Sequence, residues 1–176
     1  MADRQAAGLA VDEREATALA AFLEAFDELD NPLSQAADLV HVTGSSLVVG
    51  SRGVVLLKHK RLGFWLQPGG HIDPGETPWD AALRETVEET GLNGVFAGPL
   101  DADGVPRLLH VDVHAGGRGH KHLDLRYLVD GGTADPAPPA GESQDINWFE
   151  WDAAVERADP GLEGILRHLQ QAAELI

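Results

Sequence analysis

The first clear pattern in the chain is a helical one near the N-terminus, between Val11 and Leu29. Large apolar residues recur there at spacings of three and four, on one face of a helix that ends before Asn31-Pro32: Leu19, Phe22, Leu23, Phe26 and Leu29. A helix with one apolar face has to bury that face. We therefore expect residues 1–38 to form an N-terminal helical extension that either caps the core or meets a second subunit in a homodimer.

Downstream, the pattern becomes that of β-strands. Residues 41–49 and 54–59 are rich in Val and Leu and flank a turn-like Gly-Ser-Arg-Gly segment, which predicts a hairpin. Residues 108–114 and 120–129 alternate between polar and apolar positions around a glycine-rich loop, which predicts a second hairpin. The remaining elements are strands at 64–67 and 147–150 and closing helices at 152–158 and 162–176. We expect residues 39–176 to form one domain.

A second helix, from Pro78 to Thr90, has clear boundary signals. Thr77 suits the N-cap with Asp80 at the third helical position, and proline suits the first turn. Gly91 suits the left-handed residue that follows the last turn. These signals determine which side chains of the helix share a face.

Composition limits the classes of function. The chain has 176 residues, enough for one buried core, and no cysteine, which excludes a disulfide scaffold, a thiolate zinc site and a cysteine nucleophile. Its formal charge of -16 argues against binding to a nucleic-acid duplex or an anionic membrane surface. The longest apolar run, Ala18 to Leu23, is far shorter than the roughly 20 residues needed to cross a bilayer. Without a secretory signal at the start, the expected location is cytoplasmic.

Three carboxylates are crowded on the second helix. Glu85, Glu88 and Glu89 sit at i, i+3 and i+4, so they project from one face, and Arg84 lies four residues before Glu88. Like charges on adjacent turns destabilise a helix, and hard divalent cations that prefer carboxylate oxygens would compensate. On the glutamates alone, a solvated acidic face is the other interpretation.

The carboxylates belong to a longer spaced pattern, residues 70–92, which we call the box. It runs Gly70, five residues, Glu76, seven residues, Arg84-Glu85, two residues, Glu88-Glu89, one residue, Gly91-Leu92. This pattern resembles the signature of the Nudix hydrolase family, with every position of fixed identity present. The preceding run from Trp65 to Gly69 is similar to that family's lead-in. One position departs, because the family prefers an aliphatic residue where this chain has Thr86.

The resemblance implies a fold and a reaction. The fold is α/β (α+β), with a mixed β-sheet sandwiched between helices and the box forming a loop, a helix and a loop beside the sheet. The reaction is hydrolysis of a diphosphate linkage in a small-molecule nucleoside diphosphate derivative, with Mg²⁺ or Mn²⁺ as cofactor. The implied metal ligands are the carboxylates of Glu85, Glu88 and Glu89, with the carbonyl of Gly70 as a further candidate. Arg84 would orient a carboxylate, and Glu76 would support the loop.

Nudix enzymes differ in their general base, some using a glutamate of the box and others one from a later loop. In this chain the candidates are Glu85 and Glu142, with Glu89 third. Glu142 lies in the loop before the expected last strand, where a solvated loop residue is the alternative.

Substrate contacts are expected from two regions. Residues 39–69 carry four basic residues and no acidic ones, and any of these could meet a phosphate or form a solvated hairpin rim: Arg52, Lys58, Lys60 and Arg61. In the second hairpin, a loop at 115–119 would pair His114 with His120, Asp112 with His122 and His110 with Asp124 on one face.

That His/Asp face could hold a transition metal, hydrogen-bond a substrate base or ribose through His122, or consist of mutually paired polar groups. Arg126 continues the same face and is the first choice for a phosphate contact. The run from His120 to Tyr127 is also similar to one in a poorly characterised subgroup of Nudix proteins. Trp65, Trp148 and Phe149 could stack on a base or pack in the core.

Two further functions have to be weighed against a hydrolase. A Nudix-fold nucleotide-ligand sensor without turnover would be expected to lose box carboxylates, and this chain retains them. Nudix-fold isomerases of isoprenoid diphosphates resemble one another partly in a catalytic cysteine, which is absent. The pattern therefore favours the hydrolase and leaves its substrate open.

Overall fold

The structure is a computed structural model that describes residues 10–60 and 63–173. Over these residues it contains eight strands, four α-helices and one 3₁₀ helix. Their bounds are α2 Glu13–Asp27, β1 Val40–Gly50, β2 Gly53–Lys58, β3 Trp65–Leu66, β4 Gly69–His71, α3 Pro78–Thr90, β5 Val95–Phe96, β6 Leu108–Ala115, η1 Gly117–Gly119, β7 Lys121–Asp130, β8 Ile146–Phe149, α4 Trp151–Arg157 and α5 Glu163–Ala173. Arg61 lies outside the described residues, as does the end of the closing helix expected to reach Ile176.

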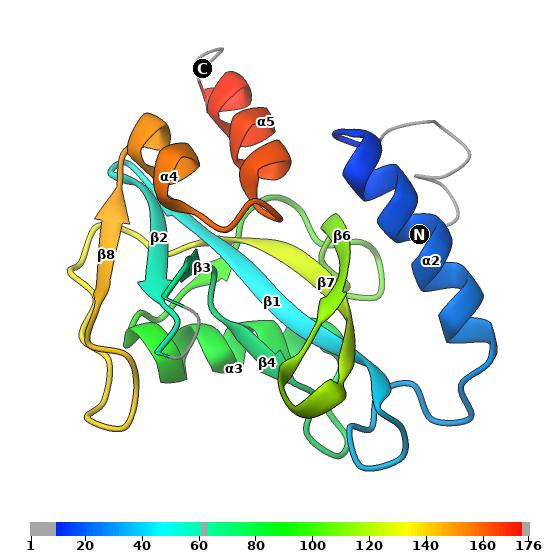
Figure 1. Cartoon of the computed structure of the whole chain (residues 1–176). Coiled ribbons are helices and arrows are strands. Elements are labelled where there is room, and N and C mark those ends of the chain that lie inside the picture. The colour runs from blue at the N-terminus through cyan, green and yellow to red at the C-terminus, as the bar shows by residue number, and fades with distance from the viewer. Residues whose placement is uncertain (1–9, 61–62, 174–176) are drawn as a thin grey trace.

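The strands form one mixed sheet with the order β3-β2-β1-β7-β5, in which β4 pairs with β1, β6 with β7 and β8 with β2. The long central strands β1 and β7 run parallel, from Val40 opposite Lys121 to Val49 opposite Asp130, and the other pairs are antiparallel. Helix α3 covers one face of the sheet, and α4 and α5 cover the other (Figure 1). The α/β fold with a mixed sheet between helices is confirmed.

Strand β1 contributes to the core on both faces of the sheet. Val42 and Val48 belong to the clusters on the α3 face, whereas Leu47 packs with Ile165 and Leu166 of α5. Helix α3 approaches β1 very closely, since a Cβ atom on Gly44 would overlap the carbonyl oxygen of Pro78. This close packing places the first turn of α3 directly against the centre of the sheet.

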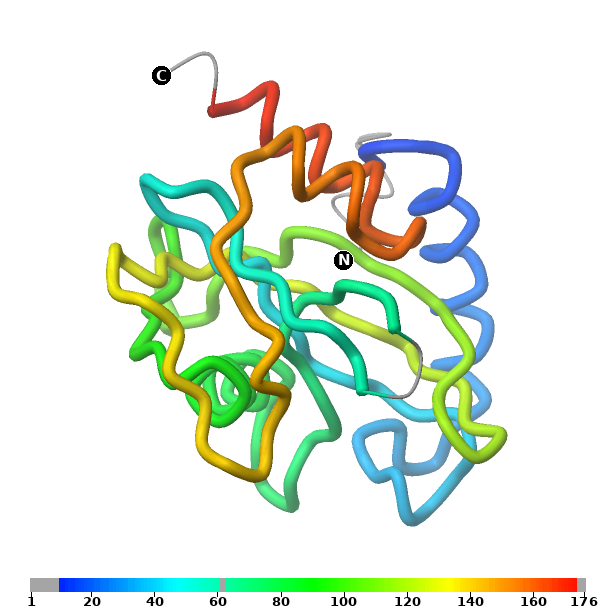
Figure 2. Tube along the Cα trace, turned by 60° about the vertical axis from the view of Figure 1, so that its left-hand side comes forward, coloured from blue at the N-terminus to red at the C-terminus, as the bar shows by residue number. Residues whose placement is uncertain are grey.

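The N-terminal helix α2 packs on β6, at the edge of the sheet (Figure 1, Figure 2). Its Leu19 and Phe22 are buried in the core cluster that also contains Val111. The carboxylate of Glu15 is 2% exposed and accepts a hydrogen bond of 3.1 Å from the backbone N–H of Val111. An unpaired edge strand exposes donors that other chains can bind. Helix α2 therefore caps the core and covers part of this edge.

The second hairpin forms with a different register from the expected one. His114 lies opposite His122, Asp112 opposite Asp124 and His110 opposite Arg126. Each partner is two residues further along than predicted, because the loop closes with a hydrogen bond from the Gly116 N–H to the His120 carbonyl. A two-residue shift keeps every side chain on the same face of the strand. The predicted faces are therefore right, and the predicted pairs are wrong.

Two short strands carried no clear hydrophobic pattern. Strand β4 pairs with β1 through Gly69, Gly70 and His71, and β5 adds two residues beside β7.

Within the described ranges, none of the helices combines the length and the hydrophobicity that a membrane span requires.

Candidate active site

Helix α3 begins and ends where the sequence predicts. Thr77 caps it in a capping box with Asp80, Pro78 is its first residue, and Gly91 follows it with a φ of 72°. The Thr77 side chain accepts a hydrogen bond from the backbone N–H of Asp80, and the Asp80 carboxylate accepts one from the backbone N–H of Thr77. These caps are local interactions that stabilise the helix and set its phase.

Thr86, the residue that departs from the family pattern, has a hydrogen-bonding partner on the sheet. Thr86 is fully buried against β1, and its hydroxyl lies 2.6 Å from the hydroxyl of Ser46. The same hydroxyl donates to the carbonyl of Ala82 at 2.7 Å. Buried hydroxyls are tolerated when they are hydrogen-bonded. Ser46 therefore allows a polar residue at this position without disturbing the packing of α3 on β1.

Arg84 connects the helix to the loop that precedes it. Its Nε and Nη2 donate to the two oxygens of Glu76 at 2.9 and 3.1 Å, a bidentate pair. Its Nη1 donates to Glu85 at 2.8 Å and to Glu88 at 3.2 Å, and Nη2 also donates to the carbonyl of His71 at 2.8 Å. The hydrogen bond from Arg84 also lowers the pKa of Glu76. Arg84 thus holds three box carboxylates and the last residue of β4 in one arrangement.

The glycines of β4 allow the helix carboxylates to approach the backbone. A Cβ atom on Gly70 would overlap the carboxylate of Glu85, so no other residue fits there without displacing that side chain. The backbone N–H of Gly69 donates to Glu89 at 3.0 Å. Glu85 and Glu89 are therefore gathered around the Gly69-Gly70 backbone. Glu88 is bonded to Arg84, as Glu85 is, and is the most exposed of the three at 55%.

The electrostatics of these carboxylates suit a bound cation. Burial raises the pKa of Glu89 to about 7, with further increases from the charges of Glu85, Glu142 and Glu88. Burial also raises the pKa of Glu85, although Arg84 opposes the change. Oxygen ligands crowded in this way are the donors that hard divalent cations prefer. The residues present therefore fit the divalent metal that the Nudix family generally uses.

Glu142 lies close enough to the box for its charge to act on Glu85 and Glu89. It is half-buried in the loop between β7 and β8. Lys60 donates a hydrogen bond to the carbonyl of Gly141, the residue before Glu142. This bond joins the loop to the segment that follows the first hairpin. Beside it is a cavity of about 370 Å³, whose lining residues are Lys58, His59, Lys60, Gly63, Ser143, Gln144 and Asp145.

Arg52 lies apart from these groups, in the turn between β1 and β2. It donates to Asp135 at 2.6 Å, and its guanidinium lies 5.7 Å from the ring centroid of Trp148. Trp148 itself is buried at 7% exposure, and its indole N–H donates to the carbonyl of Ala134. The structure therefore gives Trp148 a packing role. Trp65 and Phe149 also pack on each other, edge to face, with their ring centroids 4.8 Å apart.

The phosphate contact expected at Arg126 is not supported. This side chain is 2% exposed, and each of its three guanidinium nitrogens is bonded within the chain. Nε donates to Asp124 and Nη2 to Asp112, both at 3.0 Å, while Nη1 donates to the carbonyl of Gly161 at 3.0 Å and lies 3.2 Å from a ring nitrogen of His110. Two buried carboxylates need a buried cation. Arg126 is a structural ion-pair partner that joins β6, β7 and the start of α5.

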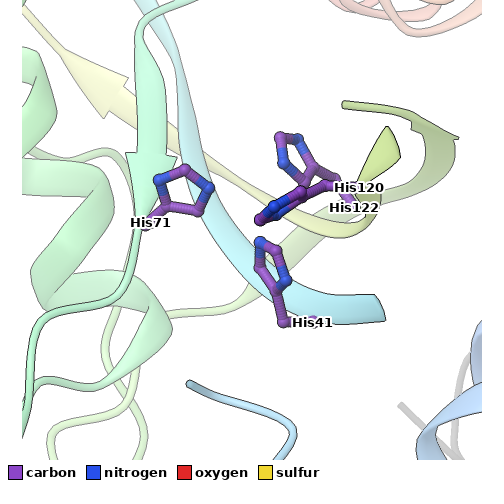
Figure 3. A group of neighbouring side chains, drawn as sticks. All are labelled: His41, His71, His120 and His122. Atoms are coloured by element: carbon purple, nitrogen blue, oxygen red, sulfur yellow. The ribbon is translucent and has the colours of Figure 1, made fainter. Parts of the chain in front are cut away.

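His122 lies in a group of four histidines, of which the sequence placed only His120 on the same face of the hairpin. It is joined by His41 of β1, His71 of β4 and His120, which precedes β7, and Figure 3 shows the four rings facing one another. We call these four residues the histidine cluster. Burial lowers the pKa of His41, and burial together with the neighbouring histidines lowers the pKa of His122 to about 4. The only signal for His41 and His71 would have been the pairing of β1 with β4 and β7, which is not visible in the sequence.

Two sequence comparisons relate this chain to known proteins. A family model described as NUDIX domain matches residues 34–169. The RNA pyrophosphohydrolase of Brucella abortus (strain 2308) is 29% identical to this chain over 131 residues, which cover 68% of this chain and 74% of that protein.

Comparison with solved structures also finds proteins of the NUDIX family. A hydrolase of the NUDIX family from Clostridium perfringens is similar with a TM-score of 0.63 and 29% identity, covering 77% of this chain and 97% of that one. A binary complex of a C. elegans Ap4A hydrolase has a TM-score of 0.58 at 20% identity, covering 76% and 99%, and supports the fold alone. The chain belongs to the NUDIX hydrolase family, and the enzyme class expected from the sequence, a hydrolase of phosphoric anhydride bonds, is confirmed.

Proposed function

We propose that this protein is a divalent-metal-dependent pyrophosphohydrolase that cleaves a diphosphate linkage in a small nucleoside diphosphate derivative. The observation that carries the proposal is the approach of two box carboxylates to the Gly69-Gly70 backbone, with Glu85 against Gly70 and Glu89 bonded to Gly69. The relative from Brucella abortus is named for the same class of reaction.

Glu85, Glu88 and Glu89 would hold Mg²⁺ or Mn²⁺, with the carbonyl of Gly70 as a further ligand. The cation would neutralise the oxygens of the diphosphate and make a bound water more acidic. Arg84 keeps Glu85 and Glu88 in place through its hydrogen bonds. Before loading, the carboxylates would repel a diphosphate, so cation binding is a condition of substrate binding.

Lys58 and Lys60 are the proposed contacts for the phosphates or the leaving group. Both line the cavity beside the loop that carries Glu142, and Lys58 is exposed at the end of β2. Arg52 is engaged with Asp135 elsewhere on the surface, so we do not retain it as a substrate contact.

The general base is proposed to be Glu142. Its backbone N–H bonds to the carbonyl of Pro139, but no hydrogen bond joins its carboxylate to any described residue. By contrast, Glu85 is held by Arg84 and Glu89 by Gly69. A carboxylate near the metal ligands and without a fixed partner can accept a proton from the attacking water.

Glu142→Gln is therefore expected to lower kcat by about 100- to 10,000-fold, the usual effect of losing a general base. Its KM for the metal-loaded substrate should change little, and Glu142→Asp should recover part of the rate. Steady-state kinetics with saturating Mg²⁺ would measure both. Wild-type kcat in Glu142→Gln would instead return the role to Glu85, whose own glutamine variant is the next test.

The proposed function is tested by a hydrolysis assay with Mg²⁺ or Mn²⁺ over a panel of candidate substrates. The panel contains nucleoside triphosphates, nucleotide sugars, ADP-ribose and dinucleoside polyphosphates. We expect turnover of at least one member, abolished by a chelator and restored by either cation. Nucleotide binding without turnover of any member would favour the sensor and overturn the hydrolase.

A further inference from the structure

The histidine cluster is assembled by the central strands of the sheet. His41 and His122 are directly opposite each other in the parallel pair of β1 and β7, and His71 reaches the same place from β4. His120 precedes His122 by two residues and therefore points to the same side of its strand. The ends of three different strands thus bring four imidazoles together at one point (Figure 3).

His41 is the centre of the cluster. Its ring centroid lies 5.1 Å from that of His71, 5.0 Å from that of His120 and 5.2 Å from that of His122. One ring nitrogen from each of the four residues lies within 4.8 Å of all the others. No hydrogen bond joins any two of these four rings, so the nitrogens do not satisfy one another.

The orientation of His41 leaves a lone pair aimed at no protein group. Its Nδ1 lies 3.1 Å from the backbone carbonyl of Asp38, which can only accept, so Nδ1 carries the proton. Nε2 is then an acceptor, yet it is buried without a hydrogen-bond partner among the described residues, and so is Nε2 of His71. His41 is fully buried. A buried polar atom without a partner is costly, so both atoms call for a ligand.

A metal ion supplies the missing partner. Metal-binding histidines typically donate their second ring N–H to a carbonyl or carboxylate, as His41 does to Asp38. Zinc bonds imidazole nitrogens at about 2.0–2.1 Å in a tetrahedron, which places the nitrogens about 3.3 Å apart. From nitrogens already within 4.8 Å of one another, small ring rotations close the site. His71, His120 and His122 are half-buried, which leaves the site reachable from solvent.

We propose that the histidine cluster binds one divalent transition-metal ion of the Zn²⁺ type. His71 is a residue of the box, but the histidine site is distinct from the carboxylate site of the box, because imidazole ligands select Zn²⁺, Cu²⁺ or Ni²⁺, whereas carboxylates and carbonyls suit Mg²⁺ and Mn²⁺. The two sites are neighbours, since His71 directly follows Gly70 and its carbonyl accepts from Arg84. The inference concerns a second, non-catalytic metal and stands whether or not the protein hydrolyses nucleotides.

The test measures Zn²⁺ bound by untagged protein in excess Mg²⁺. The protein is stripped with a chelator, loaded with Zn²⁺, dialysed and analysed for metal. We expect one Zn²⁺ per chain and a rise in Tm, because the ion binds only the folded state. Co²⁺ in its place should show the visible absorption bands of a tetrahedral nitrogen site. Since losing an outer-shell partner alone lowers metal affinity by about 10- to 100-fold, losing a ligand in His120→Asn or His122→Asn should lower it by at least about 100-fold.

The matched control is His168→Asn, a change at an exposed histidine of α5, which should bind Zn²⁺ like the wild type. His120 is half-buried, so its variant tests the site without emptying the core, and circular dichroism would check its fold. The proposal is overturned if the wild type retains no more Zn²⁺ than His120→Asn. It is equally overturned if bound Zn²⁺ survives both cluster variants and is lost in Glu88→Gln and Glu89→Gln, because the ion then belongs to the box.

Discussion

Replacing Glu88 or Glu89 by glutamine is expected to remove nearly all turnover while the protein stays folded. Glutamine keeps the shape of the side chain and, at position 89, an oxygen that can still accept from the Gly69 N–H, but it removes the charge that would hold the cation. Losing a metal ligand should lower kcat/KM by at least about 100-fold, since losing an outer-shell partner alone costs about 10- to 100-fold. Initial rates at several Mg²⁺ concentrations would measure the loss.

The matched control for these variants is Glu24→Gln, a change at an exposed glutamate of α2, outside the box. It should hydrolyse substrate at the wild-type rate, and all three proteins should have the same circular dichroism spectrum. Removing one of the crowded charges from α3 should leave this helix as stable as before or slightly more stable. If both Glu88→Gln and Glu89→Gln kept wild-type rates, the box carboxylates would not be the metal ligands.

Arg126→Met is expected to lower the free energy of unfolding by about 3–5 kcal/mol, the usual cost of breaking a buried ion pair by removing one partner. The change leaves the carboxylates of Asp112 and Asp124 buried next to each other without their shared cation. Of the two, Asp112 retains Arg14, at 3.1 Å, and His114, at 3.2 Å. Urea denaturation at pH 7 would measure the loss, and Arg107→Met, at an exposed arginine, is the control.

The same variant has an expected pH dependence. Burial alone would raise the pKa of Asp112, but His114, Arg126 and Arg14 outweigh it and lower the pKa well below its usual range. A carboxylate whose pKa is lower in the folded state contributes stability above the pKa of the unfolded chain, about 3.9, and loses it as the pH falls. The difference in stability between wild type and Arg126→Met should therefore shrink below about pH 4.

The free energy of unfolding of Arg126→Met also distinguishes a structural role for Arg126 from the phosphate contact expected from the sequence. A phosphate contact would leave stability within about 1 kcal/mol of wild type in Arg126→Met and raise KM. The burial of Arg126 at 2% exposure predicts the reverse, a large loss of stability.

Local interactions explain why the box helix could be predicted from the sequence. Its first residue and its end depend on Thr77, Asp80 and Gly91, which act within a few residues of the backbone they cap. The shared face of Glu85, Glu88 and Glu89 then follows from the helical repeat. The hairpin of β6 and β7 was only partly predictable, because alternation determines which face a side chain occupies but a loop of a few residues determines its partner.

The remaining features depend on pairing between distant segments. The parallel pair of β1 and β7 joins residues about 80 positions apart, as in the hydrogen bond of 2.8 Å from Thr43 to Asp124. Parallel pairing leaves no local signal, since its register depends on the crossover and on the packing of both faces. This pairing brings His41 beside His122. The ion pairs of Arg126 lie within the hairpin of β6 and β7, but its contact with the carbonyl of Gly161 also depends on a distant segment.

The sequence by itself therefore determined the family, the helix that carries the carboxylates and the class of reaction, because each depends on residue types at fixed local spacing. The tertiary structure alone decided which charged groups are buried as ion pairs and which histidines share a site. The physical reason is that burial and long-range strand pairing determine whether a charged or polar side chain meets water, another side chain or a bound ion.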